Sequence, residues 1–138
     1  MNSLSTQQGV KTGLRSWTLL FPVFLALAVA GCAGMQPKAE DIVRERSQAR
    51  WDALVKGDLK TAYSYFSPGS RAVLTYEDYV TSIRRGFWKS AKVEKVSCAA
   101  DTCESQVAIE YEFQRIRTKT PVRENWIREG SDWWYVQK

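Results

Sequence analysis

The sequence predicts an α+β domain, with N-terminal helices packed on a curved antiparallel sheet of about four strands. Residues 39–83 carry apolar side chains at helical spacing, with breaks only at short turns. After Gly86 the apolar spacing changes to every second residue, which indicates strands that are buried on one side. Helices followed by consecutive strands are typical of domains in which the helices cover one face of a sheet.

Residues 1–31 are expected to direct export and to take no part in the folded domain. Lys11 and Arg15 are the only charged residues in the polar start of the chain, and the segment Trp17–Gly31 has no charge. A positive region followed by a short apolar run is typical of a secretory signal. The run ends in Val29-Ala30-Gly31-Cys32, which resembles the lipobox of bacterial lipoproteins. The resemblance implies cleavage before Cys32 and attachment of lipid to its thiol.

Lipidation would make Cys32 the first residue of an anchored protein, with residues 32–38 as a tether and residues 39–138 as one α+β domain. Residue 33 is Ala, not Asp, and the resemblance then implies the outer membrane, facing the periplasm. The alternative is an uncleaved membrane span, because no charge occurs from Ser16 to Pro37 and a span needs about 20 apolar residues. Glycines and a proline near its end make that stretch a poor helix.

The overall charge is mildly basic. The chain has 20 basic and 15 acidic residues, and it has no histidine. This excess predicts a weak attraction to anionic lipid headgroups, and the expected export argues against nucleic acid as a partner. Without an imidazole, the usual serine and cysteine nucleophiles lack their base. The scattered glycines form no phosphate-binding loop, so we expect no cofactor.

Cys98 and Cys103 are expected to form a disulfide. They are the pair that remains after Cys32, and exported proteins fold where disulfides are stable. The four residues between them suit the tip of a hairpin, which brings facing side chains into bonding range. The alternative is half of a zinc site, but the sequence offers no histidine and no further cysteine as the remaining ligands.

Three helices are predicted before the sheet. Residues 39–56 contain no Gly or Pro, and their apolar positions share one helical face up to Gly57, which suits a helix C-terminus. Asp58 suits the N-cap of a second helix, which the Ser-Pro-Gly segment at residues 67–69 ends. A short turn is expected over residues 71–74. Thr75 and Asp78 then resemble a capping box for a third helix.

Four strands are predicted, over about residues 93–98, 103–116, 122–128 and 133–137. The second gives the clearest signal, because apolar side chains alternate with polar ones along its whole length. This alternation directs Glu110 and Glu112 away from the core. Their carboxylates are expected to face solvent beside Lys and Arg partners, and the alternative is a pair of catalytic carboxylates.

Several short motifs resemble one family of folds. They are residues 49–54 (Ala-Arg-Trp-Asp-Ala-Leu), Gly57-Asp58, Ala62-Tyr63, Ser67-Pro68 with Arg71, and residues 125–130 before the Trp-rich segment 133–136. Together they are similar to small bacterial lipoproteins and enzymes of the nuclear transport factor two-like group. The resemblance implies a cystatin-like or nuclear transport factor two-like cone, in which a curved sheet wraps around helices and leaves a pocket at the open end. Catalytic members use a histidine inside the cone, so no catalytic residue is carried over.

Five aromatic residues are candidates for the lining of such a pocket: Trp51, Tyr63, Tyr111, Phe113 and Trp126. A small apolar ligand is the partner that they would suit. Aromatic side chains at inward positions are more often plain core, and this alternative stays open. Tyr and Trp also carry a polar group that needs a partner when it is buried.

A basic cluster is expected where the third helix meets the first strand: Arg84, Arg85, Lys89, Lys92 and Lys95. Cations near a helix C-terminus are favoured by the helix dipole and are usually solvated. The functional alternative is docking to anionic lipid headgroups or to an acidic partner.

The leading functional hypothesis is an outer-membrane or periplasm-facing lipoprotein, a non-enzymatic accessory for binding or assembly. It is attached to the membrane through lipid on Cys32, with a protein partner or a second copy as further candidates. The first alternative is an accessory subunit of an envelope complex that uses the outer sheet face. The second is an isomerase or dehydratase of the cone type.

Overall fold

The computed structural model describes residues 37–137. The expected signal segment, the expected lipidation site Cys32 and most of the expected tether lie outside these residues. The described part has four helices and four strands: α1 Ala39–Lys56, α2 Leu59–Ser64, α3 Pro68–Val73, α4 Tyr76–Ser82, β1 Trp88–Ala99, β2 Thr102–Phe113, β3 Ile116–Glu129 and β4 Asp132–Val136. Within it, no helix combines the length and the apolar character that a membrane crossing requires.

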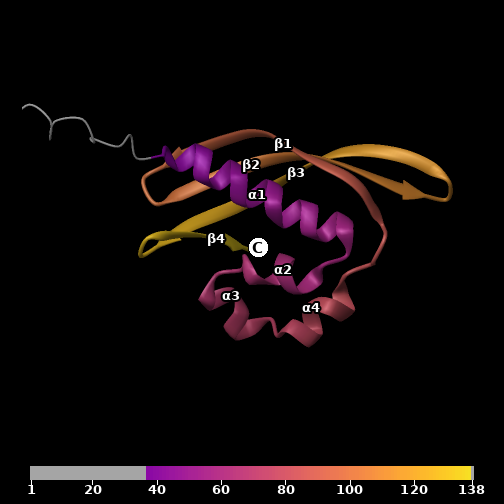
Figure 1. Ribbon diagram of the computed structural model, residues 1–138, viewed down its shortest axis with the longest axis horizontal. Coiled ribbons are helices and arrows are strands. Elements are labelled where there is room, and N and C mark those ends of the chain that lie inside the picture. The colour runs from indigo at the N-terminus through magenta and orange to yellow at the C-terminus, as the bar shows by residue number, and fades with distance from the viewer. Residues whose placement is uncertain (1–36, 138) are drawn as a thin grey trace, which may run out of the picture. The chain divides into compact units, whose positions relative to one another are not determined.

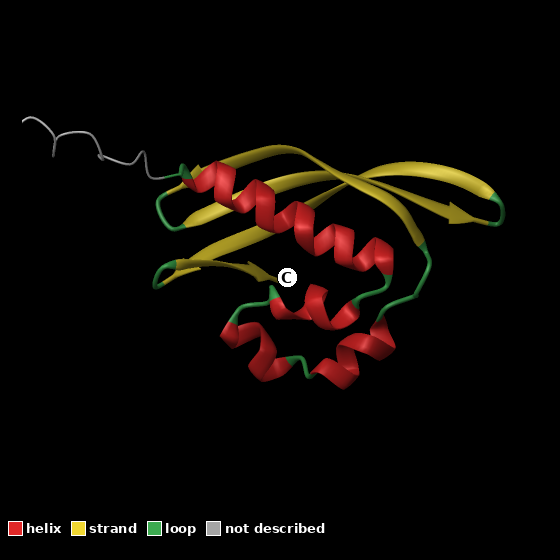
Figure 2. Cartoon of the chain, viewed as in Figure 1, coloured by secondary structure: helices red, strands yellow, loops and turns green. Residues whose placement is uncertain are grey.

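The predicted α+β architecture is confirmed. The four strands form one antiparallel sheet in the order β1-β2-β3-β4. The sheet curves around α1, which lies across its concave face, while α2, α3 and α4 gather along the far side of α1 (Figures 1 and 2). The core between these layers is made of buried aliphatic and aromatic side chains, among them Val43, Leu54, Phe66, Val107, Trp126 and Trp133.

The predicted bounds of α1 are confirmed, and the glycine after it explains its end. Gly57 has a left-handed backbone with φ 77°, a conformation that places its N–H against the carbonyl of Leu54 at 3.1 Å. The predicted N-cap is also present, because the Asp58 carboxylate accepts from the Thr61 N–H at 3.0 Å. That hydrogen bond holds the pKa of Asp58 below its usual value.

One helix was missed by the sequence patterns. The segment at residues 67–69 was expected to end α2, and it also begins α3. The Ser67 hydroxyl accepts from the Ser70 N–H at 3.0 Å, and Pro68 occupies the first turn, where its missing N–H removes no helical bond. The predicted capping box of the next helix is confirmed by the bond from the Asp78 N–H to the Thr75 hydroxyl, 3.2 Å long.

Two strands are longer than the alternation predicted. β1 begins at Trp88 rather than near Val93, and β3 begins at Ile116 rather than near Val122. The first part of β3 was not predicted because it contains Pro121, which has no backbone N–H to donate within a sheet. β4 pairs only with the last part of β3, from Asn125 onward, so Pro121 has no neighbour on that side. An open edge is the sheet position that tolerates proline.

Both edges of the sheet are partly closed by the helical layer. At β1, the side-chain amide of Gln48 donates to the Ala91 carbonyl at 3.0 Å and accepts from the Val93 N–H at 2.9 Å, as a neighbouring strand would. At β4, the Tyr135 backbone bonds to the segment after α2, donating to the Tyr65 carbonyl and accepting from the Ser67 N–H. Such cover prevents edge strands from pairing with other chains.

Candidate functional site

A buried cluster of polar side chains lies between α1 and the concave face of the sheet. We call it the interior cluster: Ser47, Arg50, Ser105, Glu124 and Trp126. Glu124 is only 2% exposed and stands at its centre. A charged residue in such a place is costly unless it is paired and hydrogen-bonded, so the cluster is the first candidate for a site.

The elements bring these residues together by simple geometry. Ser47 and Arg50 are three residues apart on α1 and therefore point to the same side. Ser105 on β2 lies directly opposite Glu124 on β3 in the strand register. Trp126 follows Glu124 by two residues, so it faces the same way.

Both oxygens of the Glu124 carboxylate are occupied. Oε1 is 2.5 Å from Nη1 of Arg50. Oε2 accepts from the Ser47 hydroxyl at 2.6 Å, from the Ser105 hydroxyl at 3.2 Å and from Nε1 of Trp126 at 3.3 Å. The four donors around this carboxylate hold it in one orientation inside the fold by charge-assisted hydrogen bonds.

Aromatic rings enclose the Arg50 guanidinium. It stacks over the ring of Tyr135 at 3.9 Å and lies within 5.7 Å of the rings of Phe66 and Trp51. Its Nε is buried and has no hydrogen-bond partner within the described part of the chain. The rings thus take the place of water around the cation, which strengthens the attraction between cation and ring faces.

The buried Tyr79 and the partly buried Tyr135 lie near the cluster, and neither suits acid–base chemistry. Burial raises the pKa of Tyr79 to about 12, and burial also raises the pKa of Tyr135. A phenol with such a pKa keeps its proton through the whole neutral range, whereas a catalytic acid or base needs a pKa near the working pH. These side chains are therefore packing elements with polar tips.

The surface hollows of the described part lie elsewhere. A groove of about 510 Å³ runs between α1 and β1 and is lined by Asp41, Arg44, Gln48 and Lys92 among others. A second hollow, of about 350 Å³, lies beside Cys98 and Cys103. Neither is lined by Arg50 or Glu124, which are 6% and 2% exposed, although Trp126 of the interior cluster borders the second hollow.

The five aromatic pocket candidates do not share one cavity. Trp51 and Trp126 are buried in the core. Tyr63 packs among Phe66, Tyr76 and Tyr79 in the helical layer. Tyr111 stacks on Phe87, with the ring centres 4.8 Å apart.

Phe113 lies at the surface of the described domain. Its side chain is 54% exposed, because β2 continues beyond the helices that cover the rest of the sheet (Figure 1). The alternation placed Phe113 on the concave face correctly, but no helix reaches that part of the face.

A weak signal for the interior cluster was present in the sequence. Glu124 is two residues from both Val122 and Trp126, so it shares a strand face with these two apolar residues. This spacing predicts that the Glu124 carboxylate points inward. Ser47 lies four residues after Val43 and four before Trp51, on the apolar face of residues 39–56, and Arg50 follows it by three residues. The alternation in β3 could not identify Arg50 as the partner of Glu124, because α1 and β3 are far apart in the chain.

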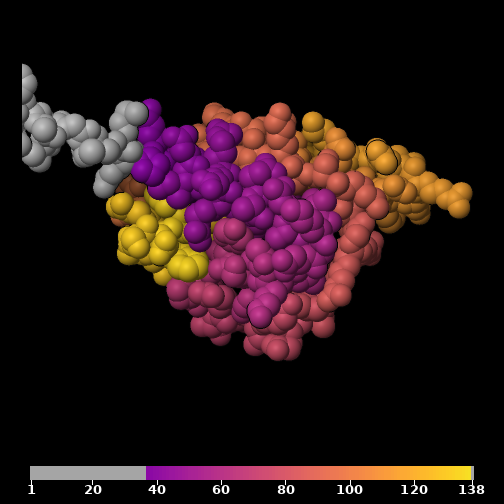
Figure 3. All heavy atoms as spheres, in the orientation of Figure 1, coloured from indigo at the N-terminus to yellow at the C-terminus, as the bar shows by residue number. Residues whose placement is uncertain are grey.

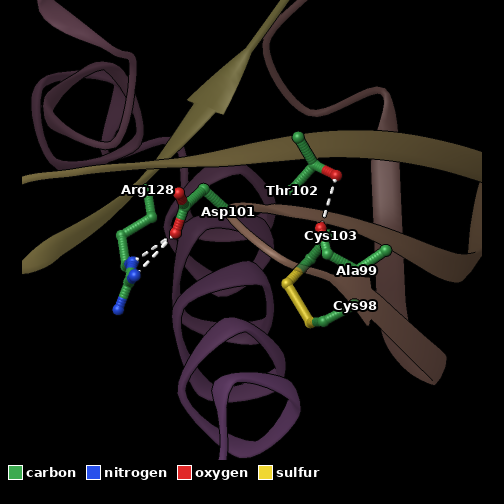
Figure 4. Close-up of a disulfide and its surroundings, with 6 residues drawn as sticks. All are labelled: Cys98, Ala99, Asp101, Thr102, Cys103 and Arg128. Atoms are coloured by element: carbon green, nitrogen blue, oxygen red, sulfur yellow. Dashed lines mark hydrogen bonds and ion pairs between the residues drawn. A yellow bond between two sulfur atoms is a disulfide. The ribbon is translucent and has the colours of Figure 1, made fainter.

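The predicted disulfide between Cys98 and Cys103 is present, with their Cα atoms 4.0 Å apart. It joins β1 and β2 one step before their turn, which is held at two further points (Figure 4). The Thr102 hydroxyl donates to the Ala99 carbonyl, and the Arg128 guanidinium bonds to the Asp101 carboxylate. Because both thiols are used, a half zinc site at this pair is excluded.

Comparisons with known proteins reveal the fold only. No family model matches the chain, and no curated protein matches it. Two solved structures of SEC-C motif containing proteins are similar. The one from Psychrobacter arcticus has a TM-score of 0.59 at 11% identity, and the match covers 75% of this chain and 63% of that one. The one from Rhodopseudomonas palustris has a TM-score of 0.55 at 9% identity, over 67% of this chain and 73% of that one.

A third structure, from Campylobacter jejuni, is described as an NTF2-like (nuclear transport factor two-like) transpeptidase. It matches with a TM-score of 0.47 at 12% identity, over 71% of this chain and 96% of that one. At such identities the likeness is one of backbone arrangement, and folds of this kind host unrelated functions. The present chain shares its α+β fold with the two SEC-C motif containing proteins, and its role must be argued from its own residues.

Proposed function

We propose that this chain is a lipid-anchored, non-enzymatic accessory protein of the bacterial envelope, which binds or assembles through its surface. Residues 1–38 support the anchor: a positive start, an uncharged apolar run and the small residues before Cys32. The same features favour the outer membrane, facing the periplasm, as its location.

One observation carries the non-enzymatic part of the proposal. The buried carboxylate of Glu124 has a donor on each oxygen, and its partner Arg50 is enclosed by rings. Chemistry inside the fold would need an acid or base with a free position and a path for substrate. Arg50 and Glu124 are 6% and 2% exposed and line neither the groove nor the second hollow, so we assign the interior to stability and the surface to function.

We also propose that the domain belongs to the nuclear transport factor two-like group. The motifs at residues 49–71 and 125–136 support this assignment, together with the curved sheet that wraps around α1. In this chain the centre of the cone is filled by the interior cluster and by aromatic rings. A small apolar ligand would have to displace them.

The anchor is tested by metabolic labelling of cells with a clickable fatty acid. The parent protein should carry the label and fractionate with membranes, whereas the variant Cys32→Ser should lose both. The double variant Cys98→Ser/Cys103→Ser is the control, because it removes the other two thiols and should keep the label. Full labelling of Cys32→Ser would disprove the lipid anchor.

The closed interior is tested by native mass spectrometry of the domain purified without detergent. We expect the mass of the polypeptide alone. A reproducible additional mass of a small apolar compound would show that the cone opens, and the surface-based function would then be wrong. The variant Ser47→Leu fills polar space in the cluster and should abolish such a complex if it forms there.

A second candidate function uses the outer, convex face of the sheet as an assembly surface. No helix covers this face within the described part, and its rows place opposite charges side by side: Glu110 pairs with Lys119, and Glu112 with Arg117. A photo-crosslinking residue at Glu110 should capture a partner or a second copy in whole cells. The same residue at Lys60, on α2, is the control, and equal capture at both positions would argue against a specific face.

A further inference from the structure

The hairpin between β2 and β3 extends beyond the rest of the domain. β1 pairs with β2 only as far as Trp88 opposite Tyr111, so the last residues of the hairpin have no neighbour from β1. We call residues 111–118 the arm. Figures 1 and 3 show it projecting past the helices as a narrow two-stranded extension.

Two large apolar side chains are exposed at the tip of the arm. Phe113 is 54% exposed and Ile116 is 65% exposed, and they face each other across the two strands. Among the described residues, one other large apolar side chain is as exposed, Val73 in α3, and it stands alone. Paired exposed apolar residues usually mark a contact surface.

Cations lie in the turn of the arm and on the sheet face opposite Phe113 and Ile116. Arg115 is in the turn, and Arg117 and Lys119 follow on β3. At the base of the arm, Phe87 stacks on Tyr111, which brings the basic stretch at residues 84–89 beside it. Residues 84–89 and 110–119 together hold six basic and two acidic residues.

The turn of the arm is built from residues that do not favour its shape. Gln114 has φ 49° and Arg115 has φ 67°, both in the left-handed region. A two-residue hairpin with both central residues there is usually Asn-Gly, because other side chains are strained in that conformation. Backbone strain of this kind tends to occur where a side chain serves a function, and here it keeps a long cationic side chain beside Phe113 and Ile116.

We propose that the arm is a membrane-contact element, which inserts Phe113 and Ile116 among the headgroups of an anionic bilayer while its cations bind lipid phosphates. The interface of a bilayer can take up a small number of apolar side chains without a complementary shape. An anionic bilayer also attracts nearby basic residues. A protein partner is less well matched. A stable protein interface covers about 800 Å² on each side, and none of the described hollows that would shape such an interface is lined by arm residues.

The arm lies at the end of the domain remote from the start of α1. Along α1, Arg44 reaches the Glu94 carbonyl and Gln48 reaches the Ala91 carbonyl, so α1 runs from the disulfide end of the sheet toward the arm. If the proposed lipid anchor precedes α1, the arm supplies a second attachment point at the opposite end, and the domain lies along the membrane. This orientation rests on the proposed function, whereas lipid binding by the arm does not.

The test uses residues 37–138, which contain the whole core of the described domain and no Cys32. Sedimentation with vesicles measures binding to phosphatidylcholine alone and to equal parts of phosphatidylcholine and phosphatidylglycerol. We expect binding to the anionic vesicles only. The double variant Phe113→Ser/Ile116→Ser should bind roughly tenfold more weakly, and the control Val73→Ser, which removes an equally exposed apolar side chain elsewhere, should bind as the parent does.

Charge is tested in the same assay. Arg115→Glu should weaken binding by about fivefold or more, and Lys60→Glu, an equal change of net charge on α2, should weaken it far less. In a separate variant, Phe113→Trp, the emission that remains after subtracting the spectrum of the parent, which has five tryptophans of its own, should shift to the blue on anionic vesicles.

Two outcomes would overturn the proposal. The first is the absence of binding to anionic vesicles, which would leave the arm to a protein partner. The second is equal binding by the arm variants and their controls, which would show that overall charge alone is responsible. Because the assay omits the lipid anchor, either result leaves the labelling test of Cys32 unaffected.

Discussion

The turns at the two ends of β2 differ in how they are stabilised. At one end, the turn to β1 is held by the Cys98–Cys103 disulfide and by the bond from Arg128 to Asp101. At the other end, the turn to β3 in the arm has no such brace, and its apolar residues face solvent. Both ends belong to one continuous ladder between β2 and β3.

The difference shows that strand pairing alone does not determine where this sheet is stable. Near the disulfide, the paired positions Ser105 and Glu124 belong to the interior cluster and are covered by α1. In the arm, the paired positions Phe113 and Ile116 have the same backbone arrangement and no cover. Stability is therefore concentrated at one end of the ladder, and the other end is free to make contacts outside the domain.

The largest effect is expected at the braced end, from Glu124→Gln. The substitution leaves the buried Arg50 cation without its counter-charge, and breaking a buried ion pair in this way costs about 3–5 kcal/mol. Urea unfolding measures the loss. Glu112→Gln in the arm is the matched control and should change the free energy of unfolding by less than about 0.5 kcal/mol. Similar losses at both positions would erase the distinction between the two ends.

The next effect concerns the disulfide. Replacing both cysteines in Cys98→Ser/Cys103→Ser should lower the free energy of unfolding by about 2 kcal/mol, because so short a loop removes modest entropy from the unfolded chain. The equivalent pair in the arm is Glu112 and Arg117, one step before the turn. A new disulfide introduced there by Glu112→Cys/Arg117→Cys should raise the free energy of unfolding of the oxidised protein by about 2 kcal/mol. If oxidation does not raise the free energy of unfolding, the arm is already ordered without a disulfide.

A smaller effect with the opposite sign is expected in the arm turn. Gln114→Asn/Arg115→Gly places favoured residues at the two left-handed positions and should stabilise the domain by about 1 kcal/mol. The same change removes a cation, so the binding to anionic vesicles should fall while the melting temperature rises. Gln114→Ala retains a side chain and should give no gain. A loss of stability in the Asn-Gly variant would show that the turn is not strained.

The smallest effect is expected from Asp101→Asn. The pair with Arg128 is at the surface, with side chains 62% and 51% exposed, and such pairs contribute about 0.5 kcal/mol. The cost should shrink in high salt, since exposed charges are screened. A large cost that persists in salt would mean that this ion pair, rather than the disulfide, holds the turn.

Local patterns anticipated a good part of the molecule. Gly57 marked the end of α1, Thr75 with Asp78 marked the start of α4, and the even pair of cysteines marked the tip of the first hairpin. These signals depend on neighbours within a few residues, so they need no knowledge of the rest of the fold. The start of α3 was missed because Ser-Pro-Gly was interpreted as the end of α2, whereas α2 ends at Ser64 and Ser67 is the N-cap of α3.

The sequence by itself determined the order of helices and strands, the alternation of β2 and the disulfide, because each follows from periodicity or from residue types close in the chain. Only the tertiary structure decided which inward positions are covered. Glu124 became the centre of a closed ion-pair cluster because α1 brings Arg50 onto it from 74 residues away. Phe113, on the same concave face, became a surface residue because the helical layer ends before it. Whether an inward side chain is buried depends on how far the helical layer extends over the sheet. The helices and the strands are distant in the chain, so no local sequence pattern contains that information.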